Sequence, residues 1–184
     1  AWGRGTNAVE IRAVPDGRLI TTLPASAKDP AWAGKWSSDG RFLAVFRKTF
    51  IRAAVTDIEI WETKAARQAL LLRQTPWGAL AFHPTLSRVW SGDRENSVGV
   101  WDLETGREAA RYSVTGSVQH IELSPDAQSV MVQHGVEKPW STSLLDAATG
   151  TVRTTVGSSW IDDIGWHPRD RWIALTARNG EVHL

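Results

Sequence analysis

Histidine, aspartate and glutamate are the side chains of this sequence that could carry acid–base or metal chemistry. His83 and His167 each stand between an aromatic residue and a proline, and a histidine repeated in one local pattern indicates a capped turn. Asp162 and Asp163 are adjacent, so on a strand their carboxylates would point to opposite sides. The sequence has no His-x-x-x-His, Gly-x-Ser-x-Gly or glycine-rich phosphate motif. We therefore predict no catalytic residue, no metal site and no cofactor.

Composition argues against two classes of partner. The 184 residues are 42% hydrophobic and 22% charged, which is an ordinary balance for a globular protein. A formal net charge of +1 gives no electrostatic attraction for nucleic acid or an anionic membrane. No apolar run approaches the roughly 20 residues of a spanning helix, and the absence of cysteine suits a reducing compartment. We expect no nucleic-acid partner, no membrane partner and a cytoplasmic location.

Two short patterns recur at a nearly constant spacing. An aromatic residue or leucine precedes a polar turn in Trp36-Ser-Ser, Phe82-His-Pro, Leu123-Ser-Pro and Trp166-His-Pro, whose first residues lie 46, 41 and 43 apart. A short strand pattern that leads into a hairpin recurs at residues 9–12, 58–61, 98–101 and 143–146. A period in the low forties, with room for four short strands, is typical of propeller blades.

The repeat resembles the WD-repeat β-propeller family in its degenerate bacterial form, over essentially the whole chain. The dipeptide that gives the family its name is present as Trp101-Asp102, with weaker copies at Trp61-Glu62 and Leu145-Asp146. The family's Gly-His dipeptide is missing from every repeat, and the turn position that usually holds aspartate carries Thr6, Glu95 or Asn179. The resemblance implies an all-β β-propeller of four-stranded antiparallel blades, which is stabilised by apolar packing more than by a His–Asp network.

The repeat makes residues 1–184 a single propeller segment of about four blades. We expect a partial blade at 1–24, full blades at 30–72, 75–113 and 116–156, and a second partial blade at 159–184. Joining the two partial blades would duplicate their third strand. We therefore expect a segment of a larger propeller, completed by further sequence or by self-association with a second copy. A small self-closed ring is the alternative.

Tryptophan is unusually frequent, with 11 residues against a single tyrosine, and such large flat side chains suit packing between sheets. Trp36 and Trp166 precede matching turns and are predicted to pack between sheets. Trp61 and Trp101 end third strands and are predicted to pack between blades as well.

Partner-binding candidates lie where the resemblance places one exposed face of the propeller. They are tryptophans at the beginning of innermost strands, and basic or aromatic residues of two long loops expected at 47–56 and 133–141: Trp32, Trp77, Trp160, Arg47, Lys48, Phe50, Arg52 and Trp140. Aromatic residues flanked by basic ones are typical of interfaces. Packing is the alternative for the tryptophans, and a solvated loop without a partner is the alternative for the loop residues.

The resemblance implies a non-catalytic protein–protein or peptide interaction module, serving as the scaffold or sensor part of a larger bacterial protein. Rigid sheets would hold the binding residues in place, so that binding costs little ordering entropy. Two alternatives stay open. One is a propeller-type enzyme, such as a lyase or a quinone-dependent dehydrogenase, which needs His, Asp or Arg side chains converging from several blades. The other is a periplasmic peptide-binding propeller.

Overall fold

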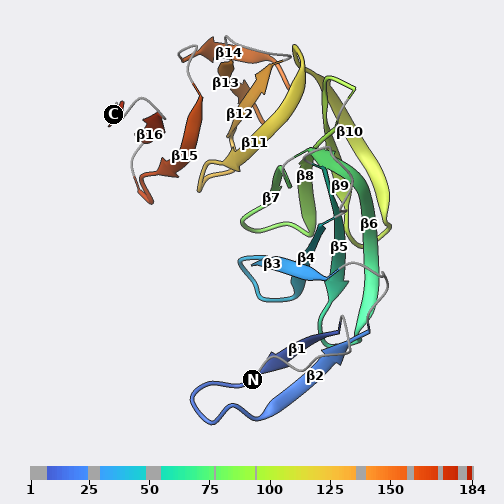
Figure 1. The fold of residues 1–184 in the computed structure, drawn as a ribbon. Coiled ribbons are helices and arrows are strands. Elements are labelled where there is room, and N and C mark those ends of the chain that lie inside the picture. Colours follow the sequence, from blue (N-terminus) through green and yellow to red (C-terminus); the bar gives the residue numbers. More distant parts are fainter. Residues whose placement is uncertain are drawn as a thin grey trace.

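Strands and the turns between them make up the described part of the chain. The computed structural model describes residues 8–24, 30–48, 55–76, 78–93, 95–135, 140–156, 160–169, 172–177 and 182–183. Within these ranges the strands pair antiparallel into five separate sheets. The sheets follow one another round an arc, with the N-terminal sheet at one end and the C-terminal sheet at the other (Figure 1).

Each sheet is a meander, in which every strand pairs with the next one along the chain. Sheet 1 contains β1 (Val9–Arg12) and β2 (Leu19–Leu23). Sheet 2 contains β3 (Ala31–Trp36), β4 (Phe42–Lys48), β5 (Val55–Glu62) and β6 (Arg67–Pro76). Sheet 3 contains β7 (Leu80–Phe82), β8 (Arg88–Gly92), β9 (Ser97–Asp102) and β10 (Arg107–Ser113).

The last two sheets continue the same order. Sheet 4 contains β11 (Ser117–Leu123), β12 (Ser129–Gly135), β13 (Ser141–Asp146) and β14 (Val152–Thr155). Sheet 5 contains β15 (Ile161–Trp166), β16 (Ile173–Ala177) and β17 (Val182–His183). The predicted all-β fold with four-stranded antiparallel sheets is confirmed.

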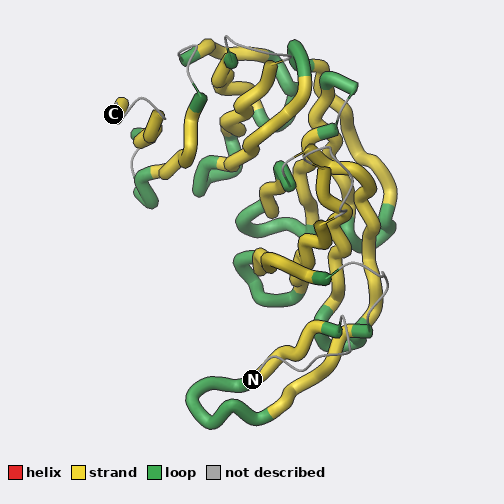
Figure 2. The backbone as a smooth tube through the Cα atoms, in the orientation of Figure 1, coloured by secondary structure: helices red, strands yellow, loops and turns green. Residues whose placement is uncertain are grey.

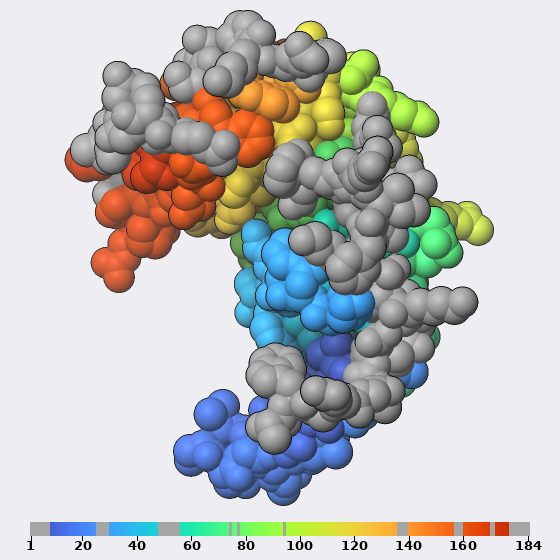
Figure 3. All heavy atoms as spheres, in the orientation of Figure 1, coloured from blue at the N-terminus to red at the C-terminus, as the bar shows by residue number. Residues whose placement is uncertain are grey.

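The first strand of each of sheets 2 to 5 lies on the inside of the arc. Strands β3, β7, β11 and β15 line the concave side, whereas β6 and β10 run along the convex side (Figure 1 and Figure 2). The space-filling view shows the arc hollowed between the N-terminal hairpin and sheet 5 (Figure 3). One copy of the sequence repeat therefore corresponds to one sheet.

The second strand of each four-stranded sheet is buried on both faces, which explains its nearly continuous apolar sequence. In β4, residues Phe42 to Phe46 are all buried, whereas the outermost strand β14 is exposed throughout. Alternate side chains of β12 face opposite neighbours. Val130 and Val132 join the cluster between sheets 3 and 4, and Met131 joins the cluster between sheets 4 and 5.

Four apolar clusters lie between successive sheets, and each draws residues from two of them. The stabilisation from burying apolar area, about 25 cal/mol per Å², therefore requires that neighbouring sheets stack. Sheets 3 and 4 approach closely at Gly92, where an added Cβ would lie 2.5 Å from Val118 Cβ. Tyr112 also links these sheets, because its hydroxyl donates to the carbonyl oxygen of Ala147 at 3.0 Å.

One position of the third strand carries buried polar chemistry that differs from sheet to sheet. In sheet 3 this position is Gly99, which leaves room for the Trp101 ring to pass across it. The indole N–H of Trp101 donates to Ser91 Oγ at 3.0 Å. In sheet 4 the position is Ser143, whose Oγ lies 2.9 Å from His134 Nε2.

In sheet 2 the same position is Glu59, which forms a buried ion pair with Arg47. The two atoms Arg47 Nε and Glu59 Oε1 lie 2.8 Å apart, and the side chains are 1% and 2% exposed. Trp61 Nε1 donates to the other oxygen of Glu59 at 3.2 Å. The prediction that Arg47 belongs to an exposed partner-binding loop is wrong, because β4 continues to Lys48 and the carboxylate of Glu59 allows the guanidinium to be buried.

The second long loop is also shorter than predicted. Strand β12 continues to Gly135, so His134 lies inside the sheet. Its Nδ1 is 2.8 Å from the carbonyl oxygen of Thr115, and the side chain is buried. Both strands extend because a polar partner inside the sheet satisfies a residue whose polarity had indicated a loop.

Replacing Arg47 by alanine is expected to lower the free energy of unfolding by about 3–5 kcal/mol, because Glu59 would stay buried without its partner. Urea denaturation followed by tryptophan fluorescence measures the change. The matched control, Arg107→Ala, removes an exposed arginine and should change stability by no more than about 0.5 kcal/mol. The double variant Arg47→Met/Glu59→Leu should regain most of the loss. A single-variant loss below about 1 kcal/mol would contradict a buried ion pair.

Candidate functional site

The turns that follow the innermost strands surround a hollow of about 440 Å³ on the concave side, which we call the concave mouth. Four sheets contribute the same two repeat positions to it. One is the last residue of the innermost strand, and the other lies two residues further: Trp36 and Ser38, Phe82 and Pro84, Leu123 and Pro125, Trp166 and Pro168. Patterns about forty residues apart in sequence therefore meet at one place because the sheets stack around an arc.

Side-chain caps hold these turns in shape. His83 Nδ1 accepts the backbone N–H groups of Thr85 at 3.1 Å and Leu86 at 3.0 Å. His167 Nδ1 accepts the N–H of Arg169 at 3.3 Å. The predicted turn-capping role of the two histidines is confirmed. Burial lowers the pKa of His83, with a smaller effect from Arg88, which favours the neutral ring that such a cap requires.

The turns without histidine use a serine and an aspartate instead. Ser37 Oγ donates to Asp39 Oδ1 at 2.6 Å, and the same aspartate oxygen accepts the N–H of Arg41 at 3.0 Å. Ser124 and Asp126 repeat this arrangement in sheet 4, with a 2.6 Å hydrogen bond between them. The rim of the mouth is thus built from locally satisfied turns.

An ion pair crosses the mouth from sheet 2 to sheet 4. Lys35 Nζ lies 3.2 Å from Glu122 Oε2 and also donates to the carbonyl oxygen of Leu80 at 3.4 Å. His120 stands two residues before Glu122 on β11, and burial lowers its pKa, while Glu122 and Asp163 oppose the shift and Lys35 adds to it. The inside of the arc therefore holds a paired lysine and a histidine that favours its neutral form.

Two tryptophans of the mouth differ in burial. Trp166 is partly buried and packs against the cluster that contains Met131, as predicted. Trp36 is 46% exposed, so the prediction that it packs between sheets is wrong. The cluster between sheets 1 and 2 contains residues of β4 and β5 but none of β3, and the Trp36 ring is left at the surface. Trp61 is buried and Trp101 packs against the cluster between sheets 2 and 3, which confirms their predicted packing role.

Trp32 and Trp160, two of the tryptophans predicted to bind a partner, lie at the beginning of innermost strands, and Trp140 directly precedes the third strand β13. Trp32 is 56% exposed and its ring centroid lies 5.9 Å from that of Phe46. Trp140 and Trp160 form an edge-on pair with centroids 4.9 Å apart, and Trp160 Nε1 donates to Asp162 Oδ1 at 3.0 Å. The structure thus brings Trp140 and Trp160 together, and their binding role stays a prediction.

Other predicted binding residues fall outside the part of the chain that the structure describes. Trp77, Phe50 and Arg52 lie in undescribed segments, and Lys48 ends β4 with a side chain that is not described. Sequence reasoning also missed the concave mouth as a surface. The sequence feature that could have indicated this surface is the proline that recurs two residues after an aromatic residue or leucine. By itself that proline predicts only a turn. No short sequence pattern predicts the Lys35–Glu122 ion pair, because the two residues are 87 positions apart in the chain.

Two searches of the described residues bear on other kinds of site. Across those ranges no group of three or more His, Cys, Asp or Glu side chains is placed to hold a metal ion. The same part of the chain contains no helix long and apolar enough to cross a membrane.

Comparison with protein-family models and with curated proteins finds no match for this chain. Solved structures do match its fold. A chain of the structure described as "Crystal Structure of Mitotic Checkpoint Complex" gives a TM-score of 0.70 at 15% identity, over 94% of this chain and 55% of that chain. A chain of "Kuenenia stuttgartiensis Hydrazine Synthase" also gives 0.70 at 15% identity, over 93% of this chain and 49% of that chain. This chain therefore spans about half the length of either match.

Sheet topology and these matches define the class of fold, a β-propeller arrangement of four-stranded antiparallel sheets. At 15% identity the matches establish the arrangement of the sheets and assign no role to any residue of the concave mouth.

Turns between third and fourth strands are capped by aspartates whose surroundings differ in one respect. Asp102 Oδ1 accepts the N–H groups of Glu104 and Thr105, at 3.1 and 2.8 Å. Asp146 caps the equivalent turn of sheet 4 and also accepts a hydrogen bond of 2.5 Å from Arg153 Nη2. The guanidinium of Arg153 and the turn N–H groups lower the pKa of Asp146 to about 2. The pKa of Asp102 is lowered mainly by the hydrogen bonds it accepts within its own turn.

The Arg153→Gln variant is expected to raise the pKa of Asp146 from about 2 toward its ordinary 3.8. Because the folded-state pKa is depressed, the stability that this carboxylate contributes is present above pH 3.8 and is lost as the pH falls toward about 2. A ¹³C NMR titration of the aspartate carboxyl groups measures both states. Asp102 is the matched control and should titrate unchanged. An Asp146 pKa that is the same in both proteins would contradict the assigned hydrogen bond.

Proposed function

We propose that this chain is a non-catalytic interaction module that binds a peptide segment of a partner protein at the concave mouth. The observation that carries the proposal is the convergence of two repeat positions from four sheets, which gathers aromatic and proline side chains at a single hollow. Trp36 is the most exposed aromatic residue among the mouth's Trp36, Phe82 and Trp166. Exposed tryptophans are frequent energetic centres of protein interfaces.

The physical character of the mouth suits a peptide. Its volume of about 440 Å³ falls within the roughly 300–1,000 Å³ of ordinary binding clefts. Proline and tryptophan side chains lose little conformational freedom when they are covered, and the sheets beneath hold their positions before binding. Both factors reduce the ordering cost of association. The Lys35–Glu122 ion pair lies beside the apolar rim and holds sheets 2 and 4 together there.

Acid–base chemistry is the less favoured use of the same hollow. Lys35 and Glu122 neutralise one another at 3.2 Å, and Lys35 also has a backbone carbonyl partner. A general base or acid needs a free lone pair or proton within reach of a substrate, and this pair is already engaged in joining two sheets. The geometry therefore supports the interaction module over a propeller-type enzyme.

Trp36→Ala is expected to weaken peptide binding by at least about tenfold, or about 1.4 kcal/mol, with little change in the thermal midpoint because the ring is half exposed. The probe is a phage-displayed library of random peptides selected on the chain, and affinities of the enriched peptides are measured by fluorescence anisotropy. Trp172→Ala is the matched control, since Trp172 is 70% exposed and does not line the mouth. Failure to enrich any peptide, or binding that is insensitive to Trp36→Ala, would contradict the proposal.

A further inference from the structure

A second hollow of about 450 Å³ lies between sheets 4 and 5, and we call it the inter-sheet groove. It shares Ser124, Pro125, Trp166 and Pro168 with the concave mouth. The two hollows are therefore adjoining parts of one surface, so that a segment seated in the mouth can continue into the groove.

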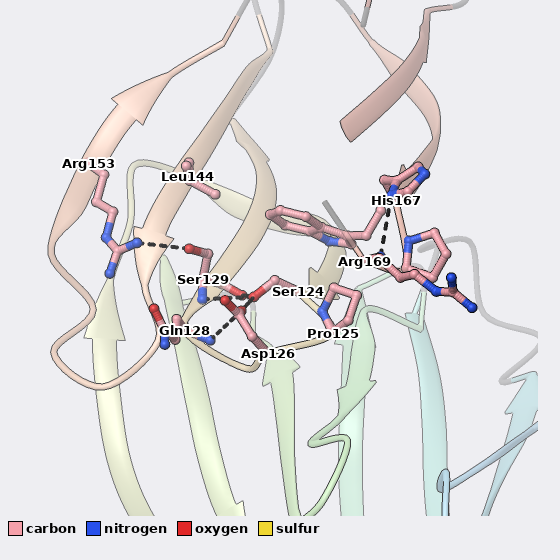
Figure 4. Close-up of a pocket in the computed structure, with 11 residues that line it drawn as sticks. Ser124, Pro125, Asp126, Gln128, Ser129, Leu144, Arg153, His167 and Arg169 are labelled. Carbon is pink, nitrogen blue, oxygen red and sulfur yellow. Dashed lines mark hydrogen bonds between the residues drawn. The ribbon is translucent and has the colours of Figure 1, made fainter. Parts of the chain in front are cut away.

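The groove combines an apolar floor with basic residues at its sides. Leu144 of β13 and Trp166 of β15 contribute apolar surface, and Ser129 contributes a hydroxyl group. Arg153 and Arg169 lie on opposite sides of the hollow (Figure 4). This arrangement suits a ligand that is apolar in its middle and negatively charged toward its ends.

Two arginines and one aspartate supply the charges of the described lining. Its acidic member is Asp126, whose Oδ1 already accepts hydrogen bonds from Ser124 Oγ at 2.6 Å and from the N–H of Gln128 at 3.0 Å. Arg153 is paired with Asp146 and donates to Ser129 Oγ at 2.9 Å. Among the described residues, Arg169 has no carboxylate within ion-pair distance, whereas Arg153 is paired with Asp146, so Arg169 is the arginine of the lining that is placed to pair with a carboxylate of a ligand.

The ring of Trp166 and the guanidinium of Arg169 are the two groups of the groove that suit an apolar and acidic ligand. The indole N–H of Trp166 is shielded from solvent and has no acceptor among the described residues. A buried donor without a partner costs free energy, and because this nitrogen is closed to solvent the Trp166 side chain offers the groove its apolar ring surface. Arginine, for its part, binds carboxylates with two parallel hydrogen bonds.

We propose that the inter-sheet groove binds an extended acidic peptide segment of the partner. An aspartate or glutamate of the segment pairs with Arg169, and an adjacent apolar side chain packs on Trp166 and Leu144. This assignment rests on the proposed peptide-binding function and names the chemistry of the partner. Specificity arises at Arg169, because that guanidinium has no carboxylate partner among the residues that the structure describes.

The test uses two phage-displayed libraries of short peptides that mix apolar, small and acidic residues. The second library replaces every aspartate and glutamate with asparagine and glutamine. Selection on the whole chain should enrich the acidic library alone, in sequences that place an acidic residue beside a large apolar one. Arg169→Glu should weaken the best peptide by at least about tenfold in fluorescence anisotropy, and a lysine-substituted peptide should regain binding to that variant.

Arg107→Glu is the matched control, because it makes the same charge change at an exposed arginine outside the groove and should leave affinity within about twofold. A thermal melt of each variant checks that the fold is retained. Equal enrichment of the two libraries, no enrichment, or binding that ignores Arg169→Glu would overturn the groove assignment. Trp36→Ala separates the two proposals. If it abolishes binding while Arg169→Glu does not, the mouth proposal stands and the groove proposal fails.

Discussion

Stacking of each sheet against its neighbours is the constraint on which every other feature of this molecule depends. The second strands have apolar side chains on both faces, as β12 shows with Val132 on one side and Met131 on the other. A sheet of this kind cannot leave either face in water without losing about 25 cal/mol for each Å² exposed. Stacked twisted sheets that share this need follow a curve, which places the innermost strands on one concave side.

The close approach of the sheets also explains which residues can vary. Gly92 has to remain without a side chain because Val118 of the next sheet occupies that space. The polar position of the third strand varies freely in type, as Glu59 and Ser143 show, provided that a partner such as Arg47 or His134 satisfies it. The same buried position of the third strand is therefore satisfied by a different polar pair in each sheet, which is consistent with the weak sequence similarity between repeats.

The repeat spacing was enough to predict the fold because one sheet is one repeat, and local turn chemistry identified His83 and His167 as caps. Burial was harder to predict where it depends on a distant partner. Arg47 was predicted to lie in a loop because its sequence neighbours do not reveal its partner Glu59 on the next strand. Trp36 was predicted to pack in the core by analogy with Phe82 and Leu123, which occupy the same repeat position and are covered by the preceding sheet. The candidate site was the hardest feature to predict from the sequence, because it is made of four segments that are distant in the chain and meet only in the folded structure.

The proposed function depends on this packing. The stacked sheets carry the turns of the concave mouth and the inter-sheet groove at fixed relative positions, so that the proposed partner segment would meet the apolar rim and Arg169 without prior rearrangement. A molecule that did not stack in this way would present the same side chains in unrelated places.

The contact between sheets 3 and 4 tests this central claim most directly. A NOESY spectrum of protein with labelled valine methyl groups reports whether the Val118 methyl protons lie beside the Hα protons of Gly92. The stacked arrangement predicts a strong cross-peak between them, because a Cβ at Gly92 would lie 2.6 Å from Val118 Cγ1. Assigned resonances of both residues with no cross-peak between them would contradict the stacking of the sheets.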